Sequence, residues 1–550
     1  PAIRWPEEST ASAGQVNGDR GCASQFEPQG YPSDLGVPLP PWAGGIFCPG
    51  RAISPQGRLA TRSRYGTFRV VPACCPPPPS GAEPYGASSG RDTQKGTCGI
   101  SMPSGHCAGE WRSTGTTPRI QVGETWNQDN REGLNMRAGI GYCGEATGAV
   151  AGRQVAQQAL ADGAISRPDL VLAFCAAAMD EEQFLKGIKG VVGESTPVAG
   201  GTAMGLISNH HLDYTDCAAA AAVLQWDSPS PVHLASADGL DRDGRETGRQ
   251  IIRSLGGSLE EQLLFLFYDS VRVPPSPTSR WILNSSAPLL EGIEDAVACP
   301  IPAVGAGLVG DFQFTAPRMF CGDKAATQHA VAVAVPRTPG PYIKIMHGCT
   351  PLDGSYHTIT KIDGACLYEI DGLPVVDAIN ELYGNDEWQQ QRPVVSLVTI
   401  GRHFGEKYGE IREQDYINRL ITGVLPDGSG IGVFEPDLVE GDEIQFMLRD
   451  TDRMVQSARE NSAALMAQVV AEGHTPALGF YIDCAGRTAQ ESRTAVEEAA
   501  EVQAVFNQHG VPLLGIYSGV EIAPFNQRNY GLDWTGVLTI LTEEEAHAAV

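Results

Sequence analysis

The chain has 550 residues, of which 65 are acidic and 39 basic, giving a formal net charge of -26 at pH 7. Such an acidic chain repels phosphate backbones and anionic lipid surfaces, which argues against nucleic-acid binding and membrane attachment as its main activity. No apolar run approaches the roughly 20 residues that span a bilayer, and no export signal is visible, so we expect a cytoplasmic protein.

Residues 1–134 differ from the rest of the chain. They are rich in proline, contain six of the 14 cysteines and show no sustained helical or alternating period. We expect a disordered extension or translated upstream sequence, with the folded protein beginning near Met136; a genuine proline-rich linker or tail is the alternative. The later cysteines are scattered through apolar segments without a CxxC pair, which predicts reduced, buried thiols.

From there on, one unit occurs three times: an apolar strand, a helix, a second strand and a glycine turn. The strands are DLVLAFC (from Asp169), LLFLFYD (from Leu263) and ALGFYIDC (from Ala477). The glycine segments are TPVAGGTAMG (from Thr196), IPAVGAGLVGD (from Ile301) and VPLLGIYSGVE (from Val511). Helical spacing follows each strand. The first helix has an acidic start at Asp180, Glu181 and Glu182, and Asn284, Ser285 or Ser286 can cap the second. Repetition at this scale indicates several copies of one supersecondary unit.

The other expected elements fit around these units. A helix over 145–162 comes first, and strand-like runs at 217–226, 312–320 and 329–335 follow. After a turn near Arg337 come antiparallel strands, a helix over 375–383, an acidic segment over 435–443, a helix over 454–471 and a closing strand over 534–541. The pattern predicts a mixed α/β (α+β) fold of two related halves, 136–340 and 341–550, each with mixed sheets covered by helices.

Two motifs suggest chemistry, and each has a plainer interpretation. GAGLVG at Gly305 matches a dinucleotide fingerprint, but strand-like sequence containing Pro317 follows where a helix is required. Cys484 would be a nucleophile if Arg487 lowered its pKa, although no partner histidine is recognisable. Arg487 is better suited to holding a ligand carboxylate, and its alternative is an internal ion pair with Glu521.

Cys484 to Arg487 (CAGR), followed by a helix and VPLLGIYSGVEIAP, resembles the C-terminal module of the FIST family of sensory proteins. ACLYEIDGLPVVDAINELYG (from Ala365) is similar to the entry of that module, and the first two units resemble the N-terminal FIST module. The resemblance implies domains at 136–340 and 341–550, no enzymatic activity, binding of a small ligand such as an amino acid, and a signalling partner.

The ligand-binding residues expected from the turns and the CAGR segment are Cys484, Gly486, Arg487, Gly519, Glu521, Gly200, Gly201, Thr202, Gly305, Gly307 and Asp311. Arg487 and Glu521 would bind the two charges of a zwitterion. No cofactor is expected. The main alternative is a haem-based gas sensor in which His347 or His357 supplies an axial nitrogen, since some relatives are associated with haem. A thiol-dependent enzyme and a ligand-free scaffold are the remaining alternatives.

Overall fold

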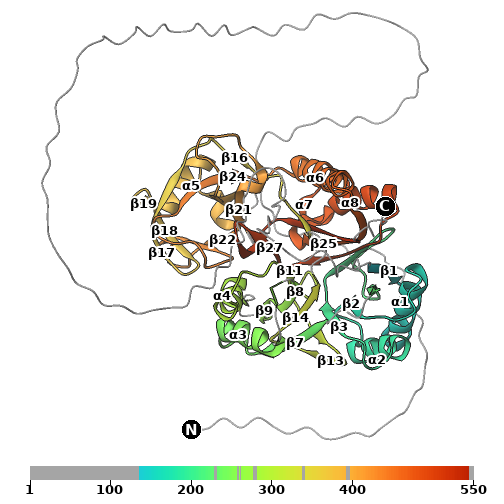
Figure 1. Ribbon diagram of the computed structural model, residues 1–550. Helices are drawn as coiled ribbons and strands as arrows, with labels where there is room; N and C mark the ends of the chain where they lie inside the picture. Colours follow the sequence, from blue (N-terminus) through green and yellow to red (C-terminus); the bar gives the residue numbers. More distant parts are fainter. Residues whose placement is uncertain are drawn as a thin grey trace, which may run out of the picture. The chain divides into compact units, whose positions relative to one another are not determined.

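The computed structural model describes residues 136–227, 232–256, 259–260, 262–276, 282–336, 341–391, 395 and 397–543 (Figure 1). All of them belong to one compact unit. The predicted extension over 1–134 lies outside the described residues. No helix in these ranges is long and apolar enough to cross a membrane.

Three repeats of one strand and helix order build the fold. In each, the chain forms a strand, a helix, the central strand, a second helix, a third strand, a two-stranded hairpin and a closing strand. Repeat 1 comprises β1 (Met136–Cys143), α1 (Gly148–Asp162), β2 (Leu170–Cys175), α2 (Glu181–Val192), β3 (Val198–Thr202), β4 (Gly205–Ser208), β5 (Leu212–Asp213) and β6 (Ala219–Trp226).

Repeat 2 comprises β7 (His233–Asp238), α3 (Gly244–Leu255), β8 (Gln262–Asp269), the small pair β9 (Val271–Val273) and β10 (Ile282–Leu283), α4 (Ser286–Ala296), β11 (Ala303–Leu308), β12 (Met319–Cys321), β13 (Lys324–Ala326) and β14 (His329–Pro336). Repeat 3 comprises β15 (Tyr342–Met346), α6 (Thr451–Ala471), β25 (Thr475–Cys484), the short helices η4 (Ala485–Arg487) and α7 (Ala489–Ser492), α8 (Glu498–His509), β26 (Leu513–Ser518), β27 (Val520–Phe525), β28 (Arg528–Leu532) and β29 (Gly536–Glu543).

A sheet is inserted between β15 and α6 of repeat 3. Its strands are β16 (Thr350–Pro351), β17 (His357–Asp363), β18 (Cys366–Ile370), β19 (Leu373–Pro374), β20 (Val398–His403), β21 (Tyr416–Arg419), β22 (Ile421–Val424), β23 (Ile431–Val433) and β24 (Glu443–Leu448). The insertion also carries α5 (Val375–Tyr383), η2 (Glu387–Gln390) and η3 (Glu413–Asp415).

The three repeats exchange hairpins in a cycle. Repeat 1 places β4 and β5 on the edge of the repeat 3 sheet, where Leu206 lies opposite Ile516. Repeat 2 places β12 and β13 beside β3 of repeat 1, and repeat 3 places β27 and β28 beside β11 of repeat 2. Each sheet therefore has four strands of its own repeat and two from another, in the orders β1-β6-β2-β3-β12-β13, β7-β14-β8-β11-β27-β28 and β15-β29-β25-β26-β4-β5.

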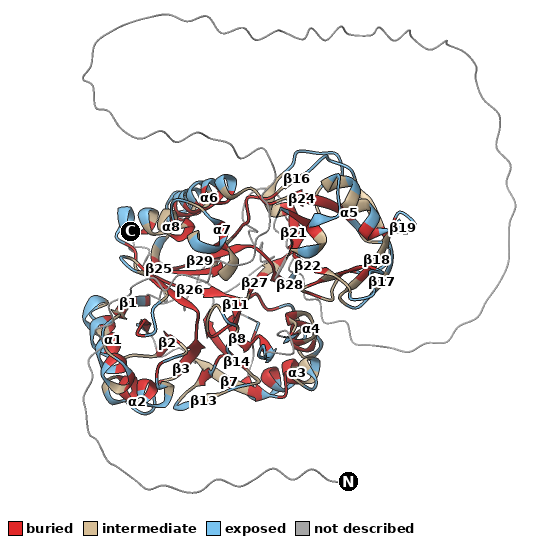
Figure 2. Ribbon diagram, turned by 180° about the vertical axis from the view of Figure 1, so that it is seen from behind, coloured by how far each residue is buried: buried red, intermediate tan, exposed pale blue. Residues whose placement is uncertain are grey.

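The sheets meet in a shared apolar core. Phe174, Phe267 and Phe480, one from the central strand of each repeat, contact one another with ring centroids 5.2, 6.0 and 6.2 Å apart. Two helices of each repeat cover the other face of its sheet, and Figure 2 shows these helices buried on one side and exposed on the other. Removing the aromatic rings from water at this junction is a main stabilising term for the fold.

Most sequence expectations for local structure are confirmed. The mixed α/β class holds, and the helices at α1, α2, α4, α5, α6 and α8 form where periodicity placed them. Asp180 caps α2 by accepting a hydrogen bond from the Gln183 N–H at 3.0 Å. The predicted domain boundary at 340 lies outside the described residues, between β14 and β15, and stays a prediction.

Three expectations are corrected. Gly200, Gly201, Gly305 and Gly307 lie within the buried strands β3 and β11, where turns were expected, and neighbouring atoms leave no room for a side chain at these positions. Of the strand expected over 312–320, only the part at β12 forms, after a turn and a loop. Seven cysteines of the described ranges are free, as predicted, but Cys299 is disulfide-bonded.

Candidate ligand-binding site

Arg487 lies in the interior, with no exposed surface on its side chain. Its guanidinium donates to the Glu498 carboxylate, with Nε to Oε2 at 2.8 Å, and lies 3.3 Å from an Asp483 oxygen. It also donates to the carbonyl oxygens of His347 (3.1 Å) and Trp534 (2.8 Å). The internal partner is therefore Glu498 with Asp483, which corrects the expected pair with Glu521.

Glu521 is also fully buried, and it accepts hydrogen bonds from the Ser518 hydroxyl at 2.8 Å and the Thr535 N–H at 3.3 Å. Burial raises the pKa of its carboxyl well above the ordinary value. Burial raises the pKa of the Cys484 thiol as well, which is the opposite of the lowered pKa that a nucleophile requires. Neither described pocket is lined by Arg487, Glu521 or Cys484, and their ligand-binding role stays a prediction.

The glycine segments do come together, but through backbone contact. The Gly519 N–H donates to the Gly307 carbonyl oxygen at 2.8 Å. A Cβ atom would lie 2.0 Å from the Ala173 oxygen at Gly200, and 1.7 Å from the Leu266 oxygen at Gly305. These glycines therefore permit close strand packing.

The remaining predicted residues are held in local contacts. Gly201 packs against Leu308, and Gly486 against the Trp534 ring. Thr202 accepts a hydrogen bond from the Arg318 N–H, and Asp311 accepts bonds from Gln313 and Thr315 in its own loop. None of these four lines a described pocket.

The two histidines considered for haem differ in their surroundings. His347 is buried, and both ring nitrogens are occupied: Nδ1 accepts from the Cys349 N–H at 2.9 Å, and Nε2 lies 2.8 Å from the Glu413 carbonyl oxygen. It does not fit an axial ligand. His357 is partly exposed, its Nδ1 lies 2.8 Å from Asp371, and it lines neither described pocket.

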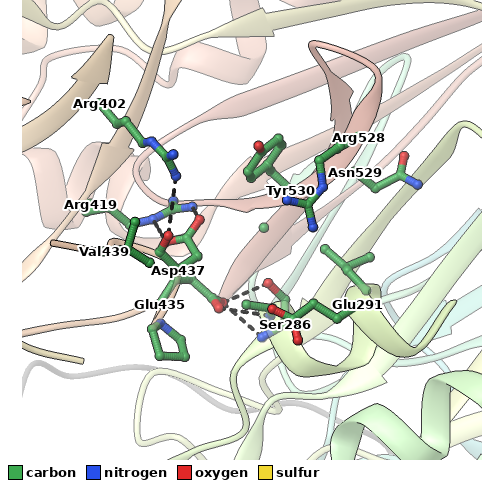
Figure 3. A pocket seen from close by; sticks show the side chains of 14 residues that line it. Ser286, Glu291, Arg402, Arg419, Glu435, Asp437, Val439, Arg528, Asn529 and Tyr530 are labelled. Carbon is green, nitrogen blue, oxygen red and sulfur yellow. Dashed lines mark hydrogen bonds and ion pairs between the residues drawn. The ribbon is translucent and has the colours of Figure 1, made fainter. Parts of the chain in front are cut away.

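A cavity of about 260 Å³ lies where the inserted sheet meets repeats 2 and 3 (Figure 3). Its walls are the start of α4, strand β28, the ends of β20 and β21, and the loop after β23. The lining residues are Ser286, Ala287, Leu290, Glu291, Arg402, Arg419, Glu435, Pro436, Asp437, Val439, Arg528, Asn529, Tyr530 and Gly531. Three guanidinium groups and three carboxyl groups are thus gathered around one small space.

The loop from Glu435 to Asp437 organises the inner wall. The Glu435 carboxylate accepts hydrogen bonds from the N–H groups of Ser286 (3.0 Å) and Ala287 (3.1 Å). These N–H groups lie at the start of α4 and have no acceptor within the helix. Asp437 accepts from Arg419, with Nε to Oδ1 at 2.7 Å, and Figure 3 shows the two side chains facing each other. Desolvation raises the pKa of Asp437, but the attraction of the fully buried Arg419 outweighs it, so the pKa is lower than the ordinary value.

The outer wall is more accessible. Arg402 has 24% of its side chain exposed and lies 2.9 Å from Asp442, whereas Arg528 has 53% exposed and lies 2.8 Å from Glu294. Glu291 lies 3.1 Å from Arg245 on the helix surface. The pairs of Arg528 and Glu291 are the more exposed ones, and an entering ligand can replace their partners because exposed ion pairs contribute only about 0–1 kcal/mol.

The acidic segment over 435–443 was a partial sequence signal for this pocket, and no pattern pointed to the arginines. Arg402, Arg419 and Arg528 are isolated in sequence and converge only because strands from the insertion and repeat 3 meet α4 of repeat 2. A single sequence shows neither the insertion nor the hairpin exchange that brings them together.

Comparison with known proteins places these features in a family. The FIST N domain profile matches residues 169–373, and the FIST C domain profile matches residues 376–524. Comparison with curated proteins gives no match.

Two solved structures show only a distant likeness. The cyanuric acid hydrolase from A. caulinodans is 9% identical with a TM-score of 0.27, covering 74% of this chain and 99% of that chain. PurLQS from Thermotoga maritima is 10% identical with a TM-score of 0.18, covering 75% and 73%. At such TM-scores the likeness carries no argument. On the two profile matches, the chain belongs to the FIST family, whose domains are described as small-ligand-binding sensory domains in signal transduction.

Proposed function

We propose that this chain is a non-enzymatic sensor that binds a small zwitterionic metabolite, an amino acid or a relative of one, in the cavity beside α4. The observation that carries the proposal is the lining of that cavity by three guanidinium and three carboxyl groups. A zwitterion presents one carboxylate and one ammonium group, and a site with balanced opposite charges can bind both. The volume of about 260 Å³ suits a molecule of that size.

The accessible arginines are the best candidates for the ligand carboxylate. Arg528 and Arg402 line the cavity and remain partly exposed. A planar ligand carboxylate would form two parallel hydrogen bonds with Arg528 by replacing Glu294, which now accepts from its Nε and Nη2 atoms. Glu291, on the same rim, is the candidate for the ammonium group. Arg419 has a structural role, since its fork is already occupied by Asp437.

Occupancy of this cavity can be transmitted because its walls belong to different parts of the fold. The loop from Glu435 to Asp437 joins the inserted sheet to α4 of repeat 2, and Arg528 lies on the hairpin that repeat 3 places beside β11 of repeat 2. A ligand that contacts these walls favours one packing of the inserted sheet against the repeats. A separate signalling protein would recognise that packing.

Calorimetry of the full chain against a panel of amino acids tests the proposal. We expect at least one member to bind and Arg528→Gln to weaken it about tenfold, which corresponds to roughly 1.4 kcal/mol. Arg242→Gln is the matched control, because Arg242 forms a similar exposed pair with Asp238 and lines neither described pocket.

Two outcomes contradict the assignment. Absence of binding by the folded chain would remove the amino-acid class. Unchanged affinity in both Arg528→Gln and Arg402→Gln would exclude this cavity as the ligand site and leave the residues around Arg487 as the candidates.

A further inference from the structure

A second cavity, of about 530 Å³, lies in repeat 1 between α2 and the hairpin of β12 and β13. Helix α2 contributes Glu182, Lys186 and Lys189, and the hairpin contributes Asp323, Lys324 and Ala326. It is separate from the cavity beside α4, with which it shares no lining residue.

The two cavities occupy the same place in their repeats. In each, the second helix of the repeat faces the second strand of the hairpin received from another repeat: α2 faces β13, and α4 faces β28. In repeat 3 the corresponding space is closed by direct hydrogen bonds. Gln503 of α8 donates to the Ser208 and His211 carbonyl oxygens, and Asn507 donates to the Asn209 carbonyl oxygen at 2.7 Å.

Lys189 makes the cavity in repeat 1 chemically distinctive. Only 6% of its surface is exposed, and its Nζ donates to the carbonyl oxygens of Glu194 (2.8 Å) and Thr196 (2.6 Å). An ammonium group has three N–H donors, so one donor has no partner among the described residues. No carboxylate of those residues lies within 4.0 Å of Nζ, whereas the buried Arg487 has two and the buried Arg419 has one.

A buried ammonium group without a counter-ion is costly, because desolvation penalises the charged form. Burial accordingly lowers the pKa of Lys189. The nearby carboxylates of Glu194 and Asp323 oppose this shift without forming an ion pair with Nζ. All other charges of the cavity belong to exposed residues, which are Glu182, Lys186, Glu194, Asp323 and Lys324. The fixed charge at the base is therefore positive, with an open donor.

We propose that this cavity is a second ligand site, which binds a small carboxylate metabolite with its carboxylate against the Lys189 ammonium group. Lys186 and Lys324 add further donors at the rim, and a bound carboxylate supplies the missing counter-ion. The site does not depend on ligand binding beside α4, since the two cavities are lined by different residues.

The test measures acetylation of lysines by a limiting amount of acetic anhydride in the full chain, followed by mass spectrometry of peptides. Succinate and glutamate are the probes, with sodium chloride at equal ionic strength as the reference. We expect either probe to slow acetylation of Lys189 at least threefold and to leave Lys361, an exposed lysine of the inserted sheet, unchanged.

A blocking variant separates this site from the first. Ala326→Trp is expected to fill the cavity from the hairpin, and it changes neither Lys189 nor the Glu194 and Thr196 carbonyl groups that accept its hydrogen bonds. We expect it to abolish the protection of Lys189, whereas Arg528→Gln preserves it. The proposal is overturned if the probes still protect Lys189 in folded Ala326→Trp. It is also overturned if acetylation of Lys189 is as slow in sodium chloride as with either probe. Protection by inorganic phosphate with none by either carboxylate overturns the ligand class.

Discussion

At the scale of single residues, buried charges are the main feature of this protein. Arg487 and Arg419 are each neutralised by a carboxylate from another segment. Asp533 is different: one carboxyl oxygen accepts from the Leu420 N–H at 2.9 Å, and the other has no hydrogen-bond partner among the described residues. Burial raises the pKa of Asp533 to about 7, with Arg419 opposing the shift. A carboxyl group so placed is protonated below neutral pH.

This predicts a pH dependence of stability that Asp533→Asn removes. The folded state keeps a proton that the unfolded chain releases near pH 4, so the contribution of Asp533 to the free energy of unfolding is complete below about pH 4. It is lost progressively as the pH rises to about 7. Urea unfolding at pH 4.5, 5.5, 6.5 and 7.5 checks this.

The free energy of unfolding of the wild-type protein should fall relative to that of Asp533→Asn as the pH rises over this range. Taking the difference between the two proteins cancels the titrating groups that do not interact with Asp533, including His347, whose pKa is lowered by burial and whose contribution has the opposite sign. A difference that stays constant with pH would show that Asp533 is ionised in the folded state.

At the scale of elements, α4 shows how tertiary structure replaces a local signal. The sequence offered Asn284, Ser285 or Ser286 as caps, and the structure begins the helix at Ser286 with Ser285 at the cap position. The Ser285 side chain makes no capping hydrogen bond. The Glu435 carboxylate, 149 residues from Ser286, accepts hydrogen bonds from the first N–H groups of the helix instead. Its negative charge also interacts favourably with the positive end of the helix dipole.

We therefore predict that Glu435→Ala destabilises the protein by about 1–3 kcal/mol, the cost of leaving buried donors unpaired. Ser285→Ala should change stability by less than about 0.5 kcal/mol, although a local capping rule would give it the larger effect. Chemical denaturation of both variants measures which substitution causes the larger loss of stability. A larger loss in Ser285→Ala than in Glu435→Ala would show that the helix is capped locally.

At the scale of the whole molecule, the hairpin cycle decides how the chain folds. The sheet of repeat 2 receives β27 and β28 from the C-terminal part of the chain, and repeat 1 supplies β4 and β5 to the sheet of repeat 3. A fragment of residues 136–340 would expose the edge of β11 and leave β4 and β5 without a partner sheet. Unpaired strand edges of this kind promote association.

We predict that residues 136–340 and 341–550 do not fold separately, although their boundary lies between two repeats. Scanning calorimetry of each fragment and of the full chain tests this. The full chain should show a main cooperative transition that both fragments lack, and mixing the fragments should restore part of it. A cooperative transition in the isolated 136–340 fragment would show that the exchanged strands are dispensable.

The sequence by itself determined the local elements, the threefold recurrence of a strand and helix unit and the family, because these depend on period, composition and short motifs. The acidic start of α2 and the helix over 375–383 belong to this class. Only the tertiary structure decided that Arg487 pairs with Glu498, that the glycines pack strands together, and that Arg402, Glu435 and Arg528 surround one cavity. These contacts join residues from distant segments through exchanged hairpins and an inserted sheet, and nothing local in the chain encodes which strand edge a hairpin will join.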